Sequence, residues 1–254
     1  MKSCLDSLPR GSEVVFHLDP SVDDSSNLLQ KIKDPRFTLI ETPERIGFSE
    51  GLNFAIENSK NSMIARLDAD DIALPWRWQV QLRAMRDLDL HFGSLLHYFP
   101  ERKVAKLIPG YPVRLEGSQF SLVTMWRNPG FHPAAMLTRD LFSELGGYRK
   151  AIAEDYDLWL RAVACGARIR RDSLPVTVYR HHGKQATADP LWEDRVSRDP
   201  LVIESKNNVA KFLGFEKGTS VVASSLLRSR NPFFFMEFRD LFRGDTIGAN
   251  SSGD

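Results

Sequence analysis

The chain has 254 residues, of which 42% are hydrophobic and 26% charged, as in globular proteins and unlike disordered chains. Its 34 basic and 33 acidic side chains give a net charge of +1, which offers no electrostatic argument for a nucleic-acid partner. The two cysteines, Cys4 and Cys165, have neither metal-site spacing nor the density of a disulfide scaffold. We therefore expect one or two domains in a reducing, cytoplasmic setting, with no signal peptide and no apolar run that crosses a bilayer.

Strands and helices are expected to alternate through the first part of the chain. Short apolar runs at 13–18, 37–40 and 63–67 predict strands. Helical spacing follows each of them, at 25–32, at 49–58 and in a helix that starts near Pro75 with Trp78, Leu82 and Met85 facing inward. This alternation predicts an α/β fold with a Rossmann-like, mostly parallel sheet flanked by helices.

The rest of the chain is less regular. Residues 92–135 read as irregular, followed by a strand within 131–137 and a helix over 139–145 that ends at Gly146 and Gly147. Residues 153–164 predict a further helix and 176–179 a short strand. We expect residues 1–189 to form one domain and 190–254 a helical C-terminal extension with a disordered end.

Acidic side chains follow two of the predicted strands. Asp19 comes after the first strand, and Asp68 and Asp70, in the sequence RLDADD, come after the third. Ligands of α/β sheets bind beyond the carboxyl ends of the strands, and carboxylates at i and i+2 can hold a hard divalent cation. The alternative is an acidic turn in which Asp71 caps the next helix.

Two later segments carry further candidates. In AEDYDLWLR, Glu154 and Asp155 either stabilise a helix start or supply a general base, while Asp157 should point elsewhere. In YRHHGK, at 179–184, a histidine could complete a metal shell and the basic side chains could neutralise phosphate. A solvated surface turn explains that second segment equally well.

Taken in order, these segments resemble the family 2 glycosyltransferases of the GT-A fold. The resemblance covers roughly residues 4–190 and also includes segments 4–8, 13–26, 44–53, 131–136 and 146–148. It implies a nucleotide-binding group at Asp19, Arg45, Gly47, Asn53 and Asp68. It further implies that Asp68, Asp70 and His182 hold Mn²⁺ or Mg²⁺, with His181 competing for the last place. Asp155 would be the catalytic base, with Glu154 as its nearest competitor.

The activity that this resemblance implies is metal-dependent, inverting sugar transfer in polysaccharide biosynthesis. The donor would be a nucleotide sugar, and the acceptor a hydroxyl of a glycan or a lipid-linked glycan. Two alternatives stay open. A nucleotidyltransferase shares acidic metal sites at strand ends but usually has a Gly-rich phosphate loop, which is not visible here. The other alternative is a non-catalytic relic that binds nucleotide sugars or glycans.

The two ends of the chain carry the remaining expectations. Family members open with an apolar strand, whereas here Met1 falls at the first helix. We therefore expect weak nucleotide-sugar binding unless an upstream segment or another chain supplies that strand. Residues 233–243 are rich in phenylalanine on one helical face, which predicts either a helix packed over the catalytic domain or a peripheral membrane contact.

Overall fold

The computed structural model describes residues 2–20, 23–100, 108–109, 113–183, 185 and 189–215. The chain divides into two compact units, Met1–Phe215 and Glu216–Asp254, and every described residue belongs to the first. The phenylalanine-rich segment at 233–243 and the chain end expected to be disordered lie outside the described residues. The expected boundary at 189–190 falls inside the first unit.

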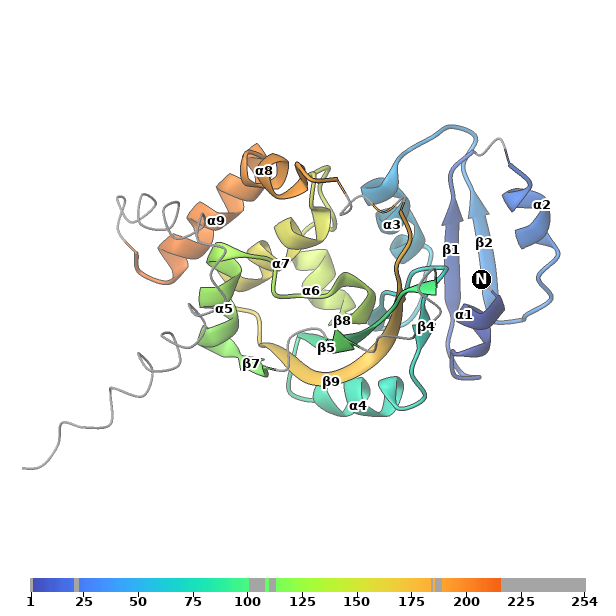
Figure 1. Ribbon diagram of the computed structural model, residues 1–254, viewed down its shortest axis with the longest axis horizontal. Helices are drawn as coiled ribbons and strands as arrows, with labels where there is room; N and C mark the ends of the chain where they lie inside the picture. Colours follow the sequence, from blue (N-terminus) through green and yellow to red (C-terminus); the bar gives the residue numbers. More distant parts are fainter. Residues whose placement is uncertain are drawn as a thin grey trace, which may run out of the picture. The chain divides into compact units, whose positions relative to one another are not determined.

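Helices and a mixed set of strands make up this unit (Figure 1). The helices are α1 (Lys2–Asp6), α2 (Ser25–Gln30), α3 (Phe48–Glu57), α4 (Arg77–Ala84), α5 (Gly117–Trp126), α6 (Arg139–Glu144), α7 (Glu154–Ala164), α8 (Trp192–Ser197) and α9 (Pro200–Phe212), with a 3₁₀ turn at His132–Ala134. The strands are β1 (Val14–Leu18), β2 (Phe37–Glu41), β3 (Met63–Ala65), β4 (Ile72–Ala73), β5 (Leu90–Tyr98), β6 (Ile108–Pro109), β7 (Leu115–Glu116), β8 (Ala135–Thr138) and β9 (Ile169–Arg180).

The strands form two sheets. In the larger one the order is β3-β8-β5-β9-β4, with β6 added beside β5 and β7 beside β9. The two longest registers, β5 with β9 and β1 with β2, are parallel, and the shorter pairings are antiparallel. The α/β fold with flanking helices is confirmed. Its parallel character rests on those two long registers, and the register of β5 with β9 brings the carboxyl ends of these two strands together.

Strands β1 and β2 form a separate parallel sheet. Among the described residues, no strand pairing joins β1 to β3, so side chains and helices connect the two sheets. The carboxylate of Glu13, just before β1, accepts hydrogen bonds from the Lys60 backbone N–H at 2.8 Å and the Asn61 amide at 3.0 Å, just before β3. Helix α3 also packs on β1, where a Cβ at Gly51 would lie 2.4 Å from the His17 ring.

The main core lies between β5, β8 and helix α7. Leu158, Trp159 and Leu160 of α7 are fully buried, and the Trp159 ring meets Phe92 of β5 edge-on at 4.8 Å. Helix α9 packs against α7 and adds the buried Val202 and Val209 to the same core. The helical character expected beyond Asp189 is thus present in α8 and α9, and α9 completes the core of the first unit.

Two sequence expectations about the middle of the chain were wrong. Residues 92–135 contain most of β5 and all of α5 instead of an irregular segment. Gly93 weakens the strand signal of β5, but a Cβ there would lie 2.3 Å from a Val176 methyl, so the close approach of β9 requires glycine. Met85, at the end of α4, is buried as expected, but Leu82 is 49% exposed because the buried face instead carries Arg77 and Gln81, which hydrogen-bond inside the core.

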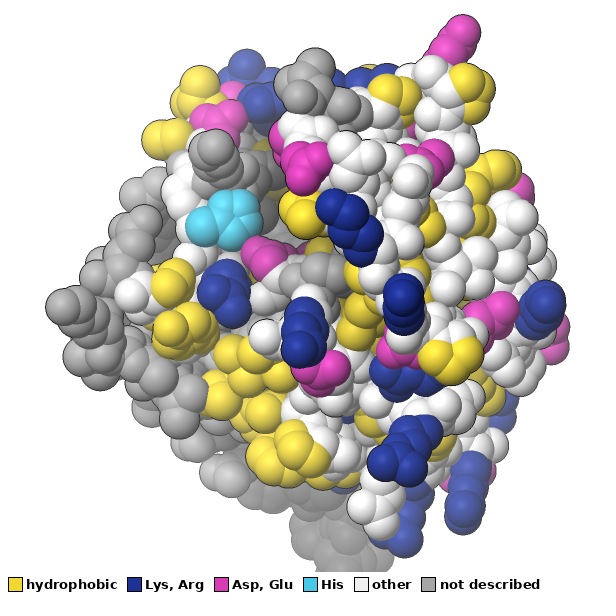
Figure 2. Space-filling view, turned by 90° about the vertical axis from the view of Figure 1, so that its right-hand side faces the viewer, with side chains coloured by type: hydrophobic (Ala, Val, Ile, Leu, Met, Phe, Trp, Pro, Cys, Tyr) yellow, Lys and Arg dark blue, Asp and Glu magenta, His cyan; other side chains and the backbone are white. Residues whose placement is uncertain are grey.

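Within the described part of the chain, no helix has the length and apolar character needed to span a membrane. Figure 2 shows the face next to β1 and β2, where acidic and basic side chains are interspersed.

Candidate functional site

The acidic turn after β3 places two carboxylates in different surroundings. Asp68 forms an ion pair with the guanidinium of Arg66, whose side chain is only 12% exposed. The Asp70 carboxylate lies 3.4 Å from Nε2 of His182, and both of these side chains are about half exposed. The other candidate, His181, is engaged elsewhere: its Nε2 lies 2.7 Å from Nδ1 of His97, and its ring stacks on Phe99.

The residues at this turn can supply only a few of the ligands that a divalent cation needs. Nowhere in the described residues do three His, Cys, Asp or Glu side chains gather as a metal cluster. Asp70 and His182 offer an oxygen and a nitrogen donor, and Mg²⁺ commonly takes only one or two carboxylates plus substrate phosphates. The donor set therefore fits a metal that shares its coordination with a bound diphosphate.

Asp71 does not cap a helix, contrary to the alternative considered from the sequence. Helix α4 starts only at Arg77, and no side chain caps it. Asp71 is buried, and its Oδ1 accepts the Arg180 backbone N–H at 2.9 Å. Burial raises its pKa to about 7. The third carboxylate of the turn therefore links the turn to the end of β9.

A buried arginine holds the strand end that carries the turn. Arg77 of α4 is fully buried and donates to the carbonyls of Arg66 and Pro133 at 2.8 and 2.9 Å and to the Thr177 hydroxyl at 2.9 Å. Burial lowers its pKa to about 9. Because these acceptors come from β9 and from the residues flanking β3 and β8, Arg77 fixes their relative positions under the acidic turn.

Asp19, Arg45 and Gly47 come together at the start of α3. The Asp19 carboxylate accepts the backbone N–H groups of Ile46 and Gly47 at 3.0 and 3.1 Å. Burial opposes ionisation, but these hydrogen bonds and the charges of His17 and Arg45 outweigh it and lower the Asp19 pKa. Gly47 has a φ of +87°, which favours glycine at this helix start. Asp19 thus orders the segment before α3, and its contact with a nucleotide stays a prediction.

Asn53 joins α3 to the turn after α6. Its amide nitrogen donates to the Tyr148 carbonyl at 2.8 Å, and its oxygen accepts the Tyr148 N–H at 2.8 Å. Gly147, with a φ of +76°, leaves room for this side chain, since a Cβ there would lie 2.8 Å from the Asn53 oxygen. The geometry gives Asn53 a structural task, and the nucleotide contact expected for it stays a prediction.

The first turn of α7 presents the candidate base. Asp155 accepts the Asn128 amide at 2.9 Å through one oxygen and the Tyr156 backbone N–H at 2.7 Å through the other. Glu154 lies beside it, with an oxygen 3.7 Å from Nδ1 of the buried His132. Burial raises the pKa of both carboxyl groups, and the charge of Asp155 adds to the effect on Glu154. A carboxyl pKa near 7, as for Glu154, suits proton transfer near neutral pH.

Asp157 points away from this pair, as expected from its position on the helix. It is fully buried and accepts hydrogen bonds from Arg149, Arg161 and Ser205 at 2.5–3.0 Å. Burial alone would raise its pKa, but the hydrogen bond from Arg149, the charge of Arg161 and the Ser205 hydroxyl lower it. Asp157 is therefore a structural ion-pair partner that ties α7 to α9.

Arg66 connects the two acidic groups, and sequence reasoning gave it no role. Its charge lowers the pKa of both Glu154 and Asp155, and the Asp68 charge raises that of Glu154. Its guanidinium also lies 5.8 Å from the Phe48 ring centre, at the start of α3. The metal candidates and the base candidates therefore share one electrostatic environment. Its position as a cation directly before LDADD was the only sequence signal for it.

Sequence comparison finds curated relatives that are glycosyltransferases. The O-antigen biosynthesis glycosyltransferase WbnJ of Escherichia coli is 32% identical over 147 residues, which are 56% of this chain and 57% of that protein. The glucosyltransferase WfaP of E. coli, named for the acceptor α-D-GlcNAc-diphosphoundecaprenol, is 24% identical over 85% of this chain and 80% of its own. The matches span between about half and two-thirds of the length of the first curated relatives.

Solved structures support the same fold. Staphylococcus aureus TarS, solved with UDP-GlcNAc, aligns with a TM-score of 0.57 at 14% identity, covering 93% of this chain and 71% of that one. The mannosyltransferase PcManGT of Pyrobaculum calidifontis, solved with GDP-Man and Mn²⁺, aligns with a TM-score of 0.55 at 18% identity, covering 95% and 75%. The chain thus has a GT-A type fold. The family model described as Glycosyl transferase family 2 matches residues 1–149, more than half of the chain, and the protein belongs to that family.

Proposed function

We propose that the protein is a metal-dependent, inverting glycosyltransferase. It moves a sugar from a nucleoside diphosphate to a hydroxyl of a glycan or lipid-linked glycan. The observation that carries this proposal is the pairing of two acidic groups around Arg66. Asp68, in the same turn as Asp70, forms an ion pair with Arg66, and the Arg66 charge also lowers the pKa of Glu154 and Asp155 of α7.

Each group has one task in such a reaction. Asp70 and His182 would hold Mn²⁺ or Mg²⁺, and Asp68 would add a further negative charge at the same turn. When bound, the ion supplies positive charge that stabilises the leaving diphosphate. Asp155 would accept the proton of the acceptor hydroxyl, on the face of the sugar opposite the diphosphate. Its hydrogen bonds from Asn128 and Tyr156 hold the carboxylate in one orientation for that step.

The donor and acceptor classes are proposed from similar proteins rather than from the geometry of the site. TarS was solved with UDP-GlcNAc, and the name of WfaP gives a diphosphoundecaprenol-linked sugar as its acceptor. Polyprenol-linked acceptors are membrane lipids, so a cytoplasmic enzyme at the membrane surface would suit them. The segment proposed for that contact, 233–243, lies outside the described residues.

A donor panel tests this proposal. Purified full-length chain is incubated with UDP-, GDP- and TDP-sugars, with Mn²⁺, Mg²⁺ or EDTA, and released nucleoside diphosphate is measured with and without lipid-linked acceptors. We expect release from one nucleotide class, dependent on the metal and accelerated by an acceptor. Donor binding without any turnover would instead support the non-catalytic relic, and turnover unaffected by EDTA would remove the metal from the proposal.

A further inference from the structure

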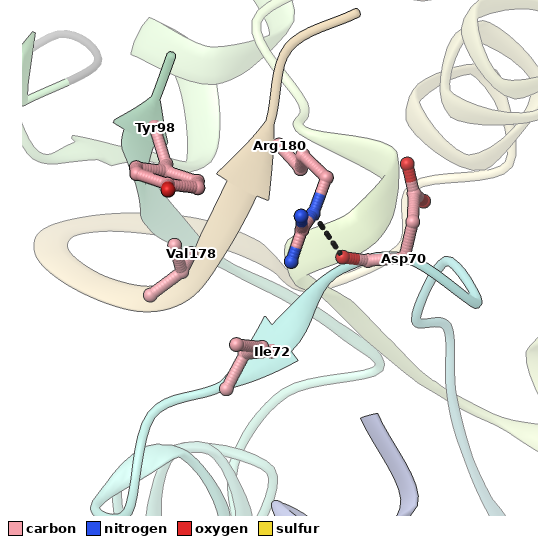
Figure 3. A pocket seen from close by; sticks show the side chains of 5 residues that line it. All are labelled: Asp70, Ile72, Tyr98, Val178 and Arg180. Carbon is pink, nitrogen blue, oxygen red and sulfur yellow. Dashed lines mark hydrogen bonds between the residues drawn. The ribbon is translucent and has the colours of Figure 1, made fainter. Parts of the chain in front are cut away.

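The pocket beside the acidic turn is lined without any contribution from α7. Figure 3 shows its lining residues, which come from the acidic turn, β4, β5 and β9: Asp70, Ile72, Tyr98, Val178 and Arg180. The orientation of Glu154 and Asp155 therefore depends on the side chains packed around the first turn of α7. One of these side chains is His132, to which the proposed reaction assigns no task.

His132 is buried beside Glu154. It opens the 3₁₀ turn at His132–Ala134, its side chain is 8% exposed, and its ring packs edge-on against Trp159 with 5.9 Å between the ring centres. Its Nε2 lies 2.8 Å from the Tyr148 hydroxyl, and its Nδ1 lies 3.7 Å from Oε1 of Glu154. The imidazole therefore has one ring nitrogen facing a hydroxyl and the other facing a carboxyl group.

The Tyr148 hydroxyl determines which ring nitrogen carries the proton. Tyr148 is buried, and burial raises its pKa, so the hydroxyl keeps its hydrogen. Within the described part of the chain, Nε2 of His132 is the one hydrogen-bond partner of that hydroxyl. If the hydroxyl accepted a hydrogen bond from His132, its own hydrogen would be buried without an acceptor, which is unfavourable. The hydroxyl therefore donates to Nε2, and the imidazole proton lies on Nδ1.

This tautomer directs the only N–H of the ring toward Glu154. Burial and the charge of Arg66 keep the pKa of His132 well below its usual range, so the ring is neutral near pH 7. Among the described residues, no Lys or Arg forms an ion pair with Glu154. The separation of 3.7 Å exceeds a hydrogen bond, and a side-chain shift of about 0.5 Å would bring the two atoms within range.

Asp155 is oriented by different partners. One of its oxygens accepts the Asn128 amide at 2.9 Å, and the other accepts the Tyr156 backbone N–H at 2.7 Å. Each oxygen keeps a further lone pair that an acceptor hydroxyl could use. The two neighbouring carboxyl groups thus differ: Asn128 orients Asp155, and the N–H of His132 faces Glu154.

We propose that His132 is a positioning residue that holds Glu154 and so leaves Asp155 as the carboxyl group that meets the acceptor hydroxyl. This inference rests on the proposed function, because it decides between the two base candidates of that reaction. Without the N–H of His132, Glu154 would be free to turn toward the acceptor and compete with Asp155 for its proton. Loss of His132 should therefore slow transfer through Glu154.

Two substitutions separate the contacts of the imidazole. His132→Gln places an amide near the Nε2 position, which preserves the contact with Tyr148 and removes the donor that faces Glu154. His132→Asn places an amide near the Nδ1 position, which preserves that donor and gives up Tyr148. The matched control is His91→Gln, because His91 of β5 is also fully buried and its Nε2 lies 2.9 Å from Asp172 instead of a base candidate.

Single-turnover transfer and calorimetric donor binding are measured for each variant. His132→Gln should lower the transfer rate about tenfold, the scale of one lost hydrogen bond, with donor affinity unchanged. His132→Asn should lose less. The double variant His132→Gln/Glu154→Ala should transfer as fast as Glu154→Ala alone, because His132 then has nothing left to position. A further tenfold loss in the double variant, or an equal loss in His91→Gln, would overturn the role, since the effect would then come from packing.

Nuclear magnetic resonance tests the same contact without any turnover. At pH 7 the ¹⁵N spectrum of wild type should show the His132 proton on Nδ1, and His132→Gln identifies that signal among the 6 histidines. The Glu154 carboxyl group, which also faces Asp155, Arg66 and Asp68, should titrate roughly half a pH unit or more higher in His132→Gln, because a donor to the charged form lowers a carboxyl pKa. A proton on Nε2 or an unchanged Glu154 titration would overturn the proposal.

These outcomes differ from failure of the proposed function. Sugar transfer by a protein whose His132 proton lies on Nε2 sinks only the role of His132. An Nδ1 proton and a shifted Glu154 titration without sugar transfer by any donor would sink the transferase and leave the contact between His132 and Glu154 in place.

Discussion

Asp155→Asn should slow catalysis strongly while leaving the fold intact. Asparagine has the same shape, and its oxygen can still accept the Tyr156 N–H. Asn128 cannot reorient freely to suit the new amide, because its own oxygen accepts the Gly130 N–H at 3.0 Å. The variant therefore loses one hydrogen bond, worth about 1 kcal/mol, but also removes a carboxylate that burial disfavours in its charged form. These two changes nearly offset each other in stability.

The effect on the rate should be much larger. Loss of a general base usually costs about 10² or more in rate, and 10² corresponds to about 2.7 kcal/mol on the barrier. Donor binding with Mn²⁺ should persist, because Asp70 and His182 are untouched. The assay is single-turnover sugar transfer alongside calorimetric donor binding and thermal unfolding of the same samples.

Asp157→Asn provides the contrast on the same helix. It removes the charge that Arg149 and Arg161 face in the buried interior, so we expect a loss of about 3 kcal/mol in unfolding free energy. Transfer should fall only as far as the folded fraction falls. Asp194→Asn, in an exposed ion pair of α8, should change neither quantity. If Asp155→Asn transferred sugar at the wild-type rate, Asp155 would not be the base.

The remaining predictions concern the acidic turn and its support. Asp70→Ala should weaken Mn²⁺ binding and Mn²⁺-dependent donor binding together, each about tenfold or more, as calorimetry would show. Unchanged Mn²⁺ binding would separate Asp70 from the metal. Arg77→Met should lower the unfolding free energy measured in urea by about 3 kcal/mol, because it leaves the Arg66 carbonyl and the buried Gln81 amide oxygen without their donor. A change below about 1 kcal/mol would contradict the role given to Arg77.

The regular elements with local signals were predictable from the sequence. The apolar runs at 37–40 and 63–67 coincide with β2 and β3, and the acidic start of α7 lies within a residue of its expected position. Strand β5 was not predictable, because glycine at position 93 is required by the close approach of Val176, 83 residues later in the chain. Likewise, the inward face of α4 is polar because Arg77 satisfies carbonyls that only the folded sheet brings together.

The sequence predicted which residue types the candidate site contains better than it predicted what each residue does. Spacing placed carboxylates at the strand ends, and the structure puts Asp70 beside His182 as anticipated. The sequence spacing could not show that Asp19 and Asn53 hydrogen-bond to backbone groups, since their partners lie 27 to 95 residues away in the chain. Nor could it show that Arg66 faces α7, because only the fold brings those two segments together.

The raised pKa values of Glu154 and Asp155 make stability and activity depend on pH in opposite directions. Because its folded pKa lies above the unfolded value, its contribution to stability is present below the unfolded pKa and is lost as the pH rises through the folded pKa. Glu154→Gln removes that loss. The variant should therefore be more stable than wild type at pH 8 by at least about 1 kcal/mol. This lower bound is smaller than the free energy that corresponds to one pKa unit. The difference should vanish near pH 4.5. His132 titrates in both proteins, so its effect largely cancels in the comparison. Transfer follows the ionised form of Asp155 and should rise as the pH rises through the raised pKa of that carboxyl group. Urea unfolding at both pH values decides the matter, and a stability difference independent of pH would show that Glu154 has an ordinary carboxyl pKa.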